Sequence, residues 1–299
     1  MKIGIIANKI LAQFIIKTFE EIGYESYLIS VRNTPLKILH DFKNCNIIYA
    51  HAPYEWKVYL LAKLFHKKVV THWIGSDGWL ATTKSKFKYY AKFCNFFTNK
   101  QLVVSSSIKE EIESIGIKNI EVIPILPKFI SRNISKMEQK NDNFTVLSYI
   151  PTKDFDFYGG KEILKLAKDD HNIKFWILTR SDTIDQYSEE NVTYLGMVPP
   201  NEMDNIYNKC HILIRYVKHD GMPKMLIEAL QKGLQVIYNF PFPFVNYCTS
   251  LEQIKKKLYE IKENYHINHK GRAYVLKNYR PEDNQILFKR VFDRVIQEK

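Results

Sequence analysis

The sequence predicts an α/β protein built from two Rossmann-like domains. Three observations lead to this prediction. Segments typical of strands and of helices alternate through most of the 299 residues. The strand segments are continuous apolar runs, which are typical of parallel strands covered on both faces. A polar stretch without periodicity, residues 131–143, separates the alternation into two halves and is interpreted as a linker. We therefore predict two doubly wound domains that face each other across a cleft.

The first predicted domain spans residues 1–130. It opens with a short apolar run that predicts a strand over residues 2–8. A helical pattern of apolar residues follows from Leu11 to Phe19, and Gly23 is placed to end that helix. Further strands are predicted at residues 26–30, 46–51, 67–73, 101–106 and 120–125, with helical stretches between most of them.

The second predicted domain spans residues 144–280 and repeats this organisation. Strands are predicted at residues 144–150, 173–179, 192–196, 211–216 and 234–239. Helices are predicted to begin near Gly160 and to cover residues 201–209 and 223–232. A last helix, residues 281–299, follows Pro281 and carries apolar residues at helical spacing.

Composition and charge narrow the class of protein. Hydrophobic residues make up 45% of the chain, which predicts a packed core, and no apolar run is long enough to span a bilayer. The start lacks a convincing signal-peptide cleavage site. The four cysteines are scattered, which favours reduced thiols, a cytoplasmic location and no metal site.

The net charge of +12 is concentrated in the first half of the chain. Residues 1–142 carry 21 Lys and Arg against 12 Asp and Glu, or +9, whereas the remainder carries 23 against 20, or +3. This excess suggests an anionic partner for the first half: nucleic acid, acidic lipid or a phosphorylated acceptor. No nucleic-acid-binding motif is present, so we expect no nucleic-acid partner.

One segment of the second half, residues 219–233, brings two carboxylates close to a helix start. Pro223 suits the first helical position and Gly233 is placed to end the helix. The free N–H groups of such a first turn attract phosphate. Asp220 precedes this anion site and Glu228 lies inside the helix. One could hold sugar hydroxyls and the other ribose hydroxyls. Alternatively, Glu228 pairs with Lys224 at i,i+4, and Asp220 is only a turn residue.

Residues 191–239 resemble the donor-binding half of retaining GT-B glycosyltransferases, especially family four. The shared pattern is a strand ending in Gly, a helix, a strand, and two acidic residues separated by seven, here Asp220 and Glu228. The resemblance implies that these carboxylates bind a nucleotide sugar. Residues 68–79 and 101–125 are similar to segments of the family's first domain.

In the first domain the resemblance implies that His72 contacts the donor sugar and that Asp77 lies in the same loop. The predicted catalytic residues are therefore Asp220, His72 and Asp77. An alternative remains for each residue of the first domain. His72 could be a hydrogen-bonded core residue, and Asp77 could cap a helix.

The chain also departs from the family pattern. Asp220 is one methylene shorter than the usual Glu. The loop that usually carries an Arg and a Lys for the diphosphate has Pro151 in the Arg place. Other basic residues could replace the missing pair only by virtue of their position. We expect N–H groups at the helix start and nearby basic side chains to neutralise the diphosphate. The predicted donor-binding residues are Glu228, Gly221, Met222, Lys224, Lys153, Lys161, Gly160 and Arg180.

The predicted activity is transfer of a sugar from a nucleotide diphosphate sugar to an acceptor hydroxyl of a glycan or a lipid-linked acceptor. The resemblance implies front-face transfer with retention, no metal and no cofactor. The only DxD motif, Asp154 to Asp156, lies in the loop of the missing basic pair and is interpreted as chance. Two alternatives share the fold: a nucleotide-sugar epimerase, and a nucleotide-sugar-binding protein without catalysis.

A last prediction places the first domain on an anionic membrane surface. Between Asp77 and Glu110 there are six lysines and no acid. In a helix over residues 84–97, three lysines line one side and aromatic residues another, as in interfacial helices. The membrane-facing residues are Lys84, Lys88 and Lys92, beside Tyr89, Tyr90, Phe93, Phe96 and Phe97. Alternatively, the aromatic side packs on the sheet and the lysines are merely solvated.

Overall fold

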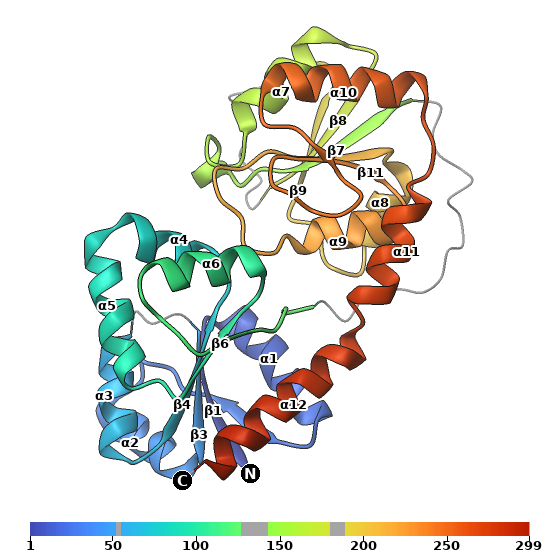
Figure 1. The fold of residues 1–299 in the computed structure, drawn as a ribbon. Coiled ribbons are helices and arrows are strands. Elements are labelled where there is room, and N and C mark those ends of the chain that lie inside the picture. Colours follow the sequence, from blue (N-terminus) through green and yellow to red (C-terminus); the bar gives the residue numbers. More distant parts are fainter. Residues whose placement is uncertain (52–54, 127–142, 180–188, 299) are drawn as a thin grey trace. The chain divides into compact units, whose positions relative to one another are not determined.

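The computed structural model describes residues 1–51, 55–126, 143–179 and 189–298. It divides into two compact units, which are drawn in Figure 1. Unit 1 consists of Met1–Leu126 with Pro281–Lys299, and unit 2 is Pro127–Arg280. Each unit contains one six-stranded sheet in which every strand pair is parallel. Apart from Asn143, the predicted linker lies outside the described residues.

The sheet of unit 1 has the strand order β2-β1-β3-β4-β5-β6. Its strands are β1 (Lys2–Ile6), β2 (Glu25–Leu28), β3 (Ile47–His51), β4 (Lys68–Trp73), β5 (Lys100–Val103) and β6 (Ile120–Val122). Its helices are α1 (Lys9–Glu21), α2 (Pro35–Asn44), α3 (Trp56–Leu64), α4 (Ser76–Thr83), α5 (Ser85–Phe96), α6 (Ser106–Ser114) and α12 (Pro281–Gln297). In Figure 1, α1 and α12 cover one face of this sheet, and α2, α3 and α5 cover the other.

Helix α12 joins unit 1 although it follows unit 2 in the sequence. Its Phe292 ring lies 4.7 Å from the ring of Phe19 on α1, and Phe288 packs on the same ring. At its far end, Lys68 of β4 donates hydrogen bonds to the carbonyls of Val295 (2.7 Å) and Ile296 (3.1 Å). A cation at this position neutralises the negative end of the helix dipole. The last helix is therefore part of the first unit's core.

The sheet of unit 2 has the strand order β12-β11-β10-β7-β8-β9. Its strands are β7 (Thr145–Tyr149), β8 (Lys174–Leu178), β9 (Val192–Gly196), β10 (Ile212–Arg215), β11 (Gln235–Tyr238) and β12 (Asn246–Tyr247). Its helices are α7 (Gly160–Asp169), α8 (Met203–Lys209), α9 (Lys224–Gln231), α10 (Leu251–Glu263) and α11 (His269–Asn278), with a 3-10 turn at Thr152–Asp154. Fully buried aliphatic residues of the central strands, such as Val146 and Ile212, form its core.

The predicted strands and helices are found, with ends that differ by a few residues. The sequence prediction missed α10 and α11, although buried Ile254, Leu258 and Ile261 of α10 recur at helical spacing. It also assigned no role to β12, which contains only two residues. None of the helices in the described ranges is long and apolar enough to cross a bilayer.

Candidate functional site

The strand order of unit 2 marks one edge of its sheet for ligand binding. From β7 the chain proceeds to β8 and β9 on one side, and it then returns to β10 on the other side of β7. The loops after β7 and β10 therefore leave the same sheet edge in opposite directions. Open α/β sheets bind ligands at such a switch point, beyond the carboxyl ends of the strands.

These two loops lie in direct contact. The backbone N–H of Lys218 donates to the carbonyl of Phe157 over 2.9 Å. Gly159 has a φ of +70°, and a Cβ placed on it would lie 2.3 Å from the carbonyl oxygen of Tyr216. Only glycine satisfies both conditions at this position. The structure thus brings together two of the segments in which the sequence predicts donor-binding residues.

Asp220 is paired with a largely buried arginine that the sequence analysis did not single out. Arg215 ends β10, and its Nε donates to Oδ2 of Asp220 over 2.5 Å. The two side chains are only 11% and 10% exposed. Burial by itself would lower the pKa of Arg215, but the adjacent Asp220 carboxylate outweighs it, so this pKa lies above its ordinary value. Asp220 is therefore a positioned carboxylate and not merely a turn residue.

Two tyrosines complete the surroundings of this ion pair. The guanidinium of Arg215 lies over the ring of Tyr158, 5.6 Å from its centroid. Tyr238, at the end of β11, pairs in register with Arg215. Burial, and then the charge of Asp220, raise the pKa of the Tyr238 hydroxyl, which stays protonated. The carboxylate thus lies beside groups from two strand ends, Arg215 of β10 and Tyr238 of β11, and Tyr158 of the loop after β7 packs on Arg215.

Glu228 lies on α9 and faces α8. It is half-buried, and its Oε2 accepts a hydrogen bond of 2.6 Å from the hydroxyl of Tyr207, which is fully buried on α8. Burial raises the pKa of Glu228, although Tyr207 and Lys224 both act in the opposite direction. Glu228 therefore does more than pair with Lys224 on an exposed face of the helix.

The start of α9 differs slightly from the prediction. The helix begins at Lys224, with Pro223 in the capping position, so Gly221 and Met222 lie in the loop before it. The free N–H groups of a helix belong to its first turn. The predicted N–H donors at Gly221 and Met222 are therefore loop amides, while Lys224 is the residue that opens the helix and its side chain is exposed.

The residues after β7 that were predicted to replace the missing Arg and Lys differ in their exposure and in their partners. Lys161 is exposed and forms an ion pair of 2.6 Å with Asp156, the second acid of the DxD motif. Lys153 is exposed. The backbone N–H of Gly160 donates to the carbonyl of Phe155. This N–H group is therefore already engaged, and it does not support the prediction that Gly160 binds substrate. Arg180 lies outside the described residues.

In unit 1, His72 is a fully buried core residue. Its Nε2 lies 2.9 Å from the carbonyl of Ile123, and its Nδ1 lies 2.9 Å from the hydroxyl of Tyr49. A carbonyl only accepts, so Nε2 carries the proton and Nδ1 accepts from Tyr49. Burial, and then the charge of His51, lower the pKa of His72 to about 3. The prediction that His72 contacts the donor sugar is thus replaced by its alternative, because both nitrogens and the whole ring are enclosed.

Asp77 likewise has a structural role. The carboxylate is buried and accepts hydrogen bonds from the backbone N–H groups of Ile74, Gly75 and Gly78, at 2.7–3.1 Å. It holds the loop before α4 from the first turn of that helix, but the N-cap residue is Gly75, so the alternative in which Asp77 is the N-cap is not confirmed. The predicted catalytic role has no observation behind it. The accessible group beside Asp77 is His51, which ends β3 and lies 4.0 Å from the carboxylate.

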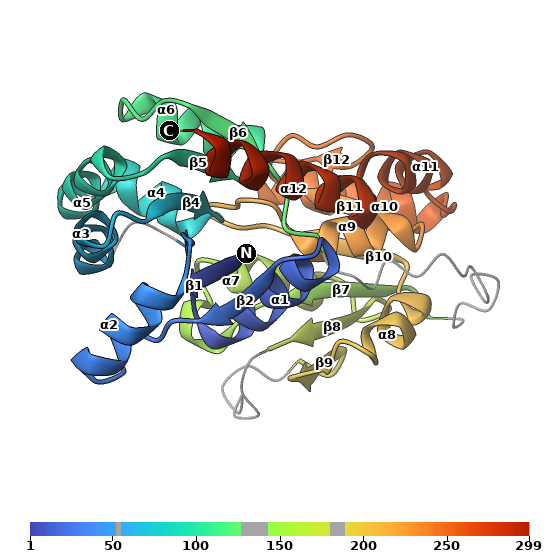
Figure 2. The same ribbon diagram turned by 90° about the horizontal axis from the view of Figure 1, so that it is seen from below.

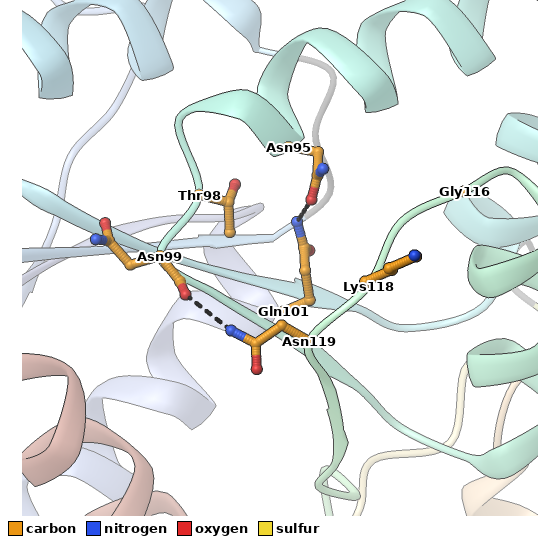
Figure 3. Close-up of a pocket in the computed structure, with 7 residues that line it drawn as sticks. All are labelled: Asn95, Thr98, Asn99, Gln101, Gly116, Lys118 and Asn119. Carbon is orange, nitrogen blue, oxygen red and sulfur yellow. Dashed lines mark hydrogen bonds between the residues drawn. The ribbon is translucent and has the colours of Figure 1, made fainter.

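A polar pocket of unit 1 lies elsewhere. It has a volume of about 320 Å³ and is lined by polar side chains near the amino end of β5, including Asn95, Asn99 and Asn119 (Figure 3). Gln101 donates to Asn95 over 2.8 Å, so its amides are engaged with one another. By contrast, His51 is the last residue of β3, and Asp77 follows the carboxyl end of β4. The candidate site is defined by the residues at the carboxyl ends of the strands, and not by this pocket. No group of three or more His, Cys, Asp or Glu in the described ranges could hold a metal ion.

Comparison with known proteins identifies the fold. No family model and no curated protein matches the sequence. Among solved structures, HepE of Anabaena in complex with UDP-glucose is similar to this chain with a TM-score of 0.79 and 11% identity, covering 98% of this chain and all of that one. Sucrose-phosphate synthase of Thermosynechococcus elongatus has a TM-score of 0.74 at 11% identity, with 99% of both chains covered.

The lipopolysaccharide outer core galactosyltransferase WaaB is also similar, with a TM-score of 0.64 and 15% identity over 97% of this chain and all of that one. Identities this low define the fold alone. The fold is GT-B, which confirms the predicted class of two Rossmann-like domains.

Proposed function

We propose that the chain is a glycosyltransferase that moves a sugar from a nucleoside diphosphate sugar to an acceptor hydroxyl. The observation that carries this proposal is the pair of acids Asp220, in the loop after β10 at the switch point of unit 2, and Glu228, on the helix α9 that follows this loop. Each carboxylate is held by a dedicated partner, Arg215 or Tyr207. Solved proteins of this fold include a UDP-glucose complex and a galactosyltransferase, which supports a nucleotide-sugar donor.

The two carboxylates are assigned different roles. Asp220, held by Arg215, orients hydroxyls of the donor sugar. Glu228 accepts hydrogen bonds from the ribose hydroxyls of the nucleotide through the oxygen that Tyr207 does not occupy. Loop amides at Gly221 and Met222, the first turn of α9 and an exposed lysine such as Lys153 stabilise the diphosphate as it leaves.

Transfer with retention, without a metal or a cofactor, completes the proposed reaction. No side chain of the site is assigned as a covalent nucleophile. The incoming hydroxyl therefore attacks the face from which the diphosphate departs. The anomeric configuration of the product, read by NMR, tests retention. Activity abolished by a chelator and restored by Mn²⁺ would contradict metal independence.

The proposal also includes the class of acceptor and the cellular location of the enzyme. A glycan or a lipid-linked acceptor fits a basic first half, and the enzyme is expected in the cytoplasm, at an anionic membrane surface. All four cysteines are free and buried, as a reduced compartment allows.

A screen of nucleotide sugars by thermal stabilisation tests donor binding first. A ligand at a hundred times its dissociation constant adds about 2.7 kcal/mol to the stability of the folded state. Glu228→Ala should weaken binding by roughly 1.5–3 kcal/mol, the contribution of a hydrogen bond to a charged group. Asp220→Ala should chiefly lower turnover. Asp169→Asn, which breaks the ion pair with Lys255, is the control and should change neither.

The same screen separates the alternatives. Stabilisation followed by sugar transfer to an acceptor supports the proposal. Isomerised donor without an acceptor indicates an epimerase, and binding without any product indicates a nucleotide-sugar-binding protein. Full transfer activity in the Asp220→Ala/Glu228→Ala double variant would remove the site assignment.

A further inference from the structure

Helix α5 presents three of its aromatic side chains to solvent and small residues to the core. Tyr89 is 75% exposed and Phe96 82% exposed, and Phe93 lies between them on the same face. The buried residues of the helix are Ala91 and Cys94. The alternative in which the aromatic side packs on the sheet is therefore wrong for these three residues. An amphipathic helix of a globular domain normally has the opposite arrangement.

Helix α3 extends this apolar surface. Trp56, Leu60 and Leu64 recur every four residues and are all exposed, Leu64 to 69%. The two helices lie side by side in both views of Figures 1 and 2. The rings of Trp56 and Phe93 meet edge to face with centroids 6.4 Å apart. We call the residues Trp56, Leu60, Leu64, Tyr89, Phe93 and Phe96 the α3–α5 surface.

Lysines border the α3–α5 surface. On α5, Lys88 and Lys92 follow one flank of the aromatic row and Lys86 the other, as helical spacing dictates, and all three are exposed. From residue 56 to residue 109 the chain carries ten lysines and one acid. That acid is Asp77, which is buried and bonded to backbone amides. Two of these lysines, Lys100 and Lys109, pair with Glu121 and Glu113, and exposed Glu55 directly precedes Trp56. The positive charge beside this surface therefore comes chiefly from the three exposed lysines of α5.

We propose that the α3–α5 surface inserts into the interface of an anionic lipid bilayer. Aromatic and leucine side chains enter the boundary between headgroups and acyl chains, while the surrounding lysines contact the anionic headgroups. A protein partner fits less well, because lysine is depleted from the cores of protein interfaces. This names the part of unit 1 that makes the membrane contact, and it depends on unit 1 alone and not on donor binding by unit 2.

Vesicle binding tests the proposal directly. The full-length protein is mixed with vesicles of phosphatidylcholine alone or with added phosphatidylglycerol, at low and at high salt, and is separated by flotation. We expect binding only to the anionic vesicles, and weaker binding at high salt. Lys84→Gln/Lys88→Gln/Lys92→Gln should reduce the partition coefficient about a hundredfold. The control Lys165→Gln/Lys174→Gln/Lys256→Gln removes equal charge from unit 2 and should have little effect.

A second readout locates the contact. Trp56 should shift its fluorescence to shorter wavelength on vesicle binding, and this change should vanish in Trp56→Phe. Tyr89→Ser/Phe93→Ser/Phe96→Ser should reduce anionic binding while the protein stays folded by circular dichroism, since these side chains are exposed. Ile286→Ser/Met197→Ser, at exposed sites elsewhere, is the matched control.

Three results would overturn the proposal. The first is absence of binding to anionic vesicles. The second is an equal loss of binding in both lysine triple variants, which would indicate net charge rather than this surface. The third is a dimer in solution that the aromatic variant converts to a monomer, which would assign the surface to a second copy of the chain. Donor-induced thermal stabilisation, measured on every variant, reports separately on unit 2.

Discussion

Asp220 and Glu228 show how two carboxylates on one segment acquire different properties. Asp220 faces a permanent cation, Arg215, at 2.5 Å. Glu228 faces a neutral hydroxyl, Tyr207, at 2.6 Å, and burial raises its pKa. A fixed ion pair suits a group that orients a ligand, whereas a half-buried carboxylate, one oxygen of which accepts from Tyr207, suits a group that accepts hydrogen bonds from ligand hydroxyls with the other oxygen. Each arrangement can be tested separately.

Replacement of Arg215 tests whether it positions Asp220. Arg215→Met leaves a nearly buried carboxylate without its cation, and breaking such a pair costs about 3–5 kcal/mol. Arg215→Lys keeps the charge but loses the planar fork. We expect Arg215→Lys to lower kcat with little change in KM, because Asp220 remains charged but is displaced. Unfolding curves and steady-state kinetics provide the measurements. An Arg215→Met/Asp220→Asn variant should recover part of the lost stability; no recovery would mean that Arg215 acts elsewhere.

We expect the replacement of Glu228 by glutamine to change stability and nucleotide binding in opposite directions. Because the folded-state pKa of Glu228 is raised, the folded protein holds its proton more tightly than the unfolded chain does. Stability of the natural protein therefore falls as pH rises from the ordinary carboxyl pKa through the raised one. Glu228→Gln cannot ionise but can still accept from Tyr207. It should be more stable than the natural protein at neutral pH, with weaker nucleotide binding.

Urea unfolding at several pH values, together with calorimetric titration of the donor, checks this prediction. The two proteins should have similar stabilities below the ordinary carboxyl pKa, where Glu228 is protonated in both folded and unfolded chains. A glutamine variant that is less stable than the natural protein throughout would contradict the assigned pKa direction.

At the level of elements, α12 is held to unit 1 at both ends of its packed face. Phe288 and Phe292 pack on α1, and Lys68 donates to the carbonyls of Val295 and Ile296 in the last turn and of Glu298 just beyond it. Residues that are more than two hundred positions apart in the sequence thus share one local hydrogen-bond network. A lysine at a strand start offers no sequence signal for such a contact.

Lys68→Met should destabilise unit 1 by about 1 kcal/mol, the scale of a cation at a helix C-terminus. The melting temperature should fall by about 2–4 °C. Lys174→Met is the control, because Lys174 is also a lysine at a strand start but is exposed. Differential scanning calorimetry of the two variants makes the comparison. An equal loss in both variants would contradict a specific contribution of the α12 contact.

The sequence predicted elements better than it predicted the site. Strands such as β4 and β10 are apolar runs whose identity depends on local pattern and burial on both faces. The roles of His72 and Asp77 were less predictable, because the same residue types serve as ligands, as caps and as buried hydrogen-bond partners. Only the positions of Tyr49 and Ile123 decide the role of His72. Arg215 lay within a predicted strand, and its pairing with Asp220 depends on how the following loop turns back.

At the level of the whole molecule, unit 1 is discontinuous in sequence whereas unit 2 is continuous. A chain that ends at Arg280 keeps all of unit 2 but loses the helix whose Phe288 and Phe292 fill the core beside Phe19. Loss of a single core phenylalanine side chain typically costs about 3–5 kcal/mol. We expect this truncated chain to lose the cooperative unfolding of unit 1 while its thermal stabilisation by donor persists. Limited proteolysis should then cut within β1–β6 first. Equal protease resistance of the truncated and the full-length chains would contradict the conclusion that unit 1 needs α12 for its stability.

The late return of α12 also has a consequence for biosynthesis. Ribosomes extend a chain by roughly 5–20 residues per second, so the 154 residues of unit 2 (127–280) take roughly 8–30 seconds to translate. During that interval the first sheet has already emerged, but the apolar face around Phe19 and Tyr49 still lacks its covering helix. Unit 2 can complete its folding before unit 1 does, even though it is made second. The nascent chain is therefore most prone to aggregation at a surface that is fully enclosed in the finished protein.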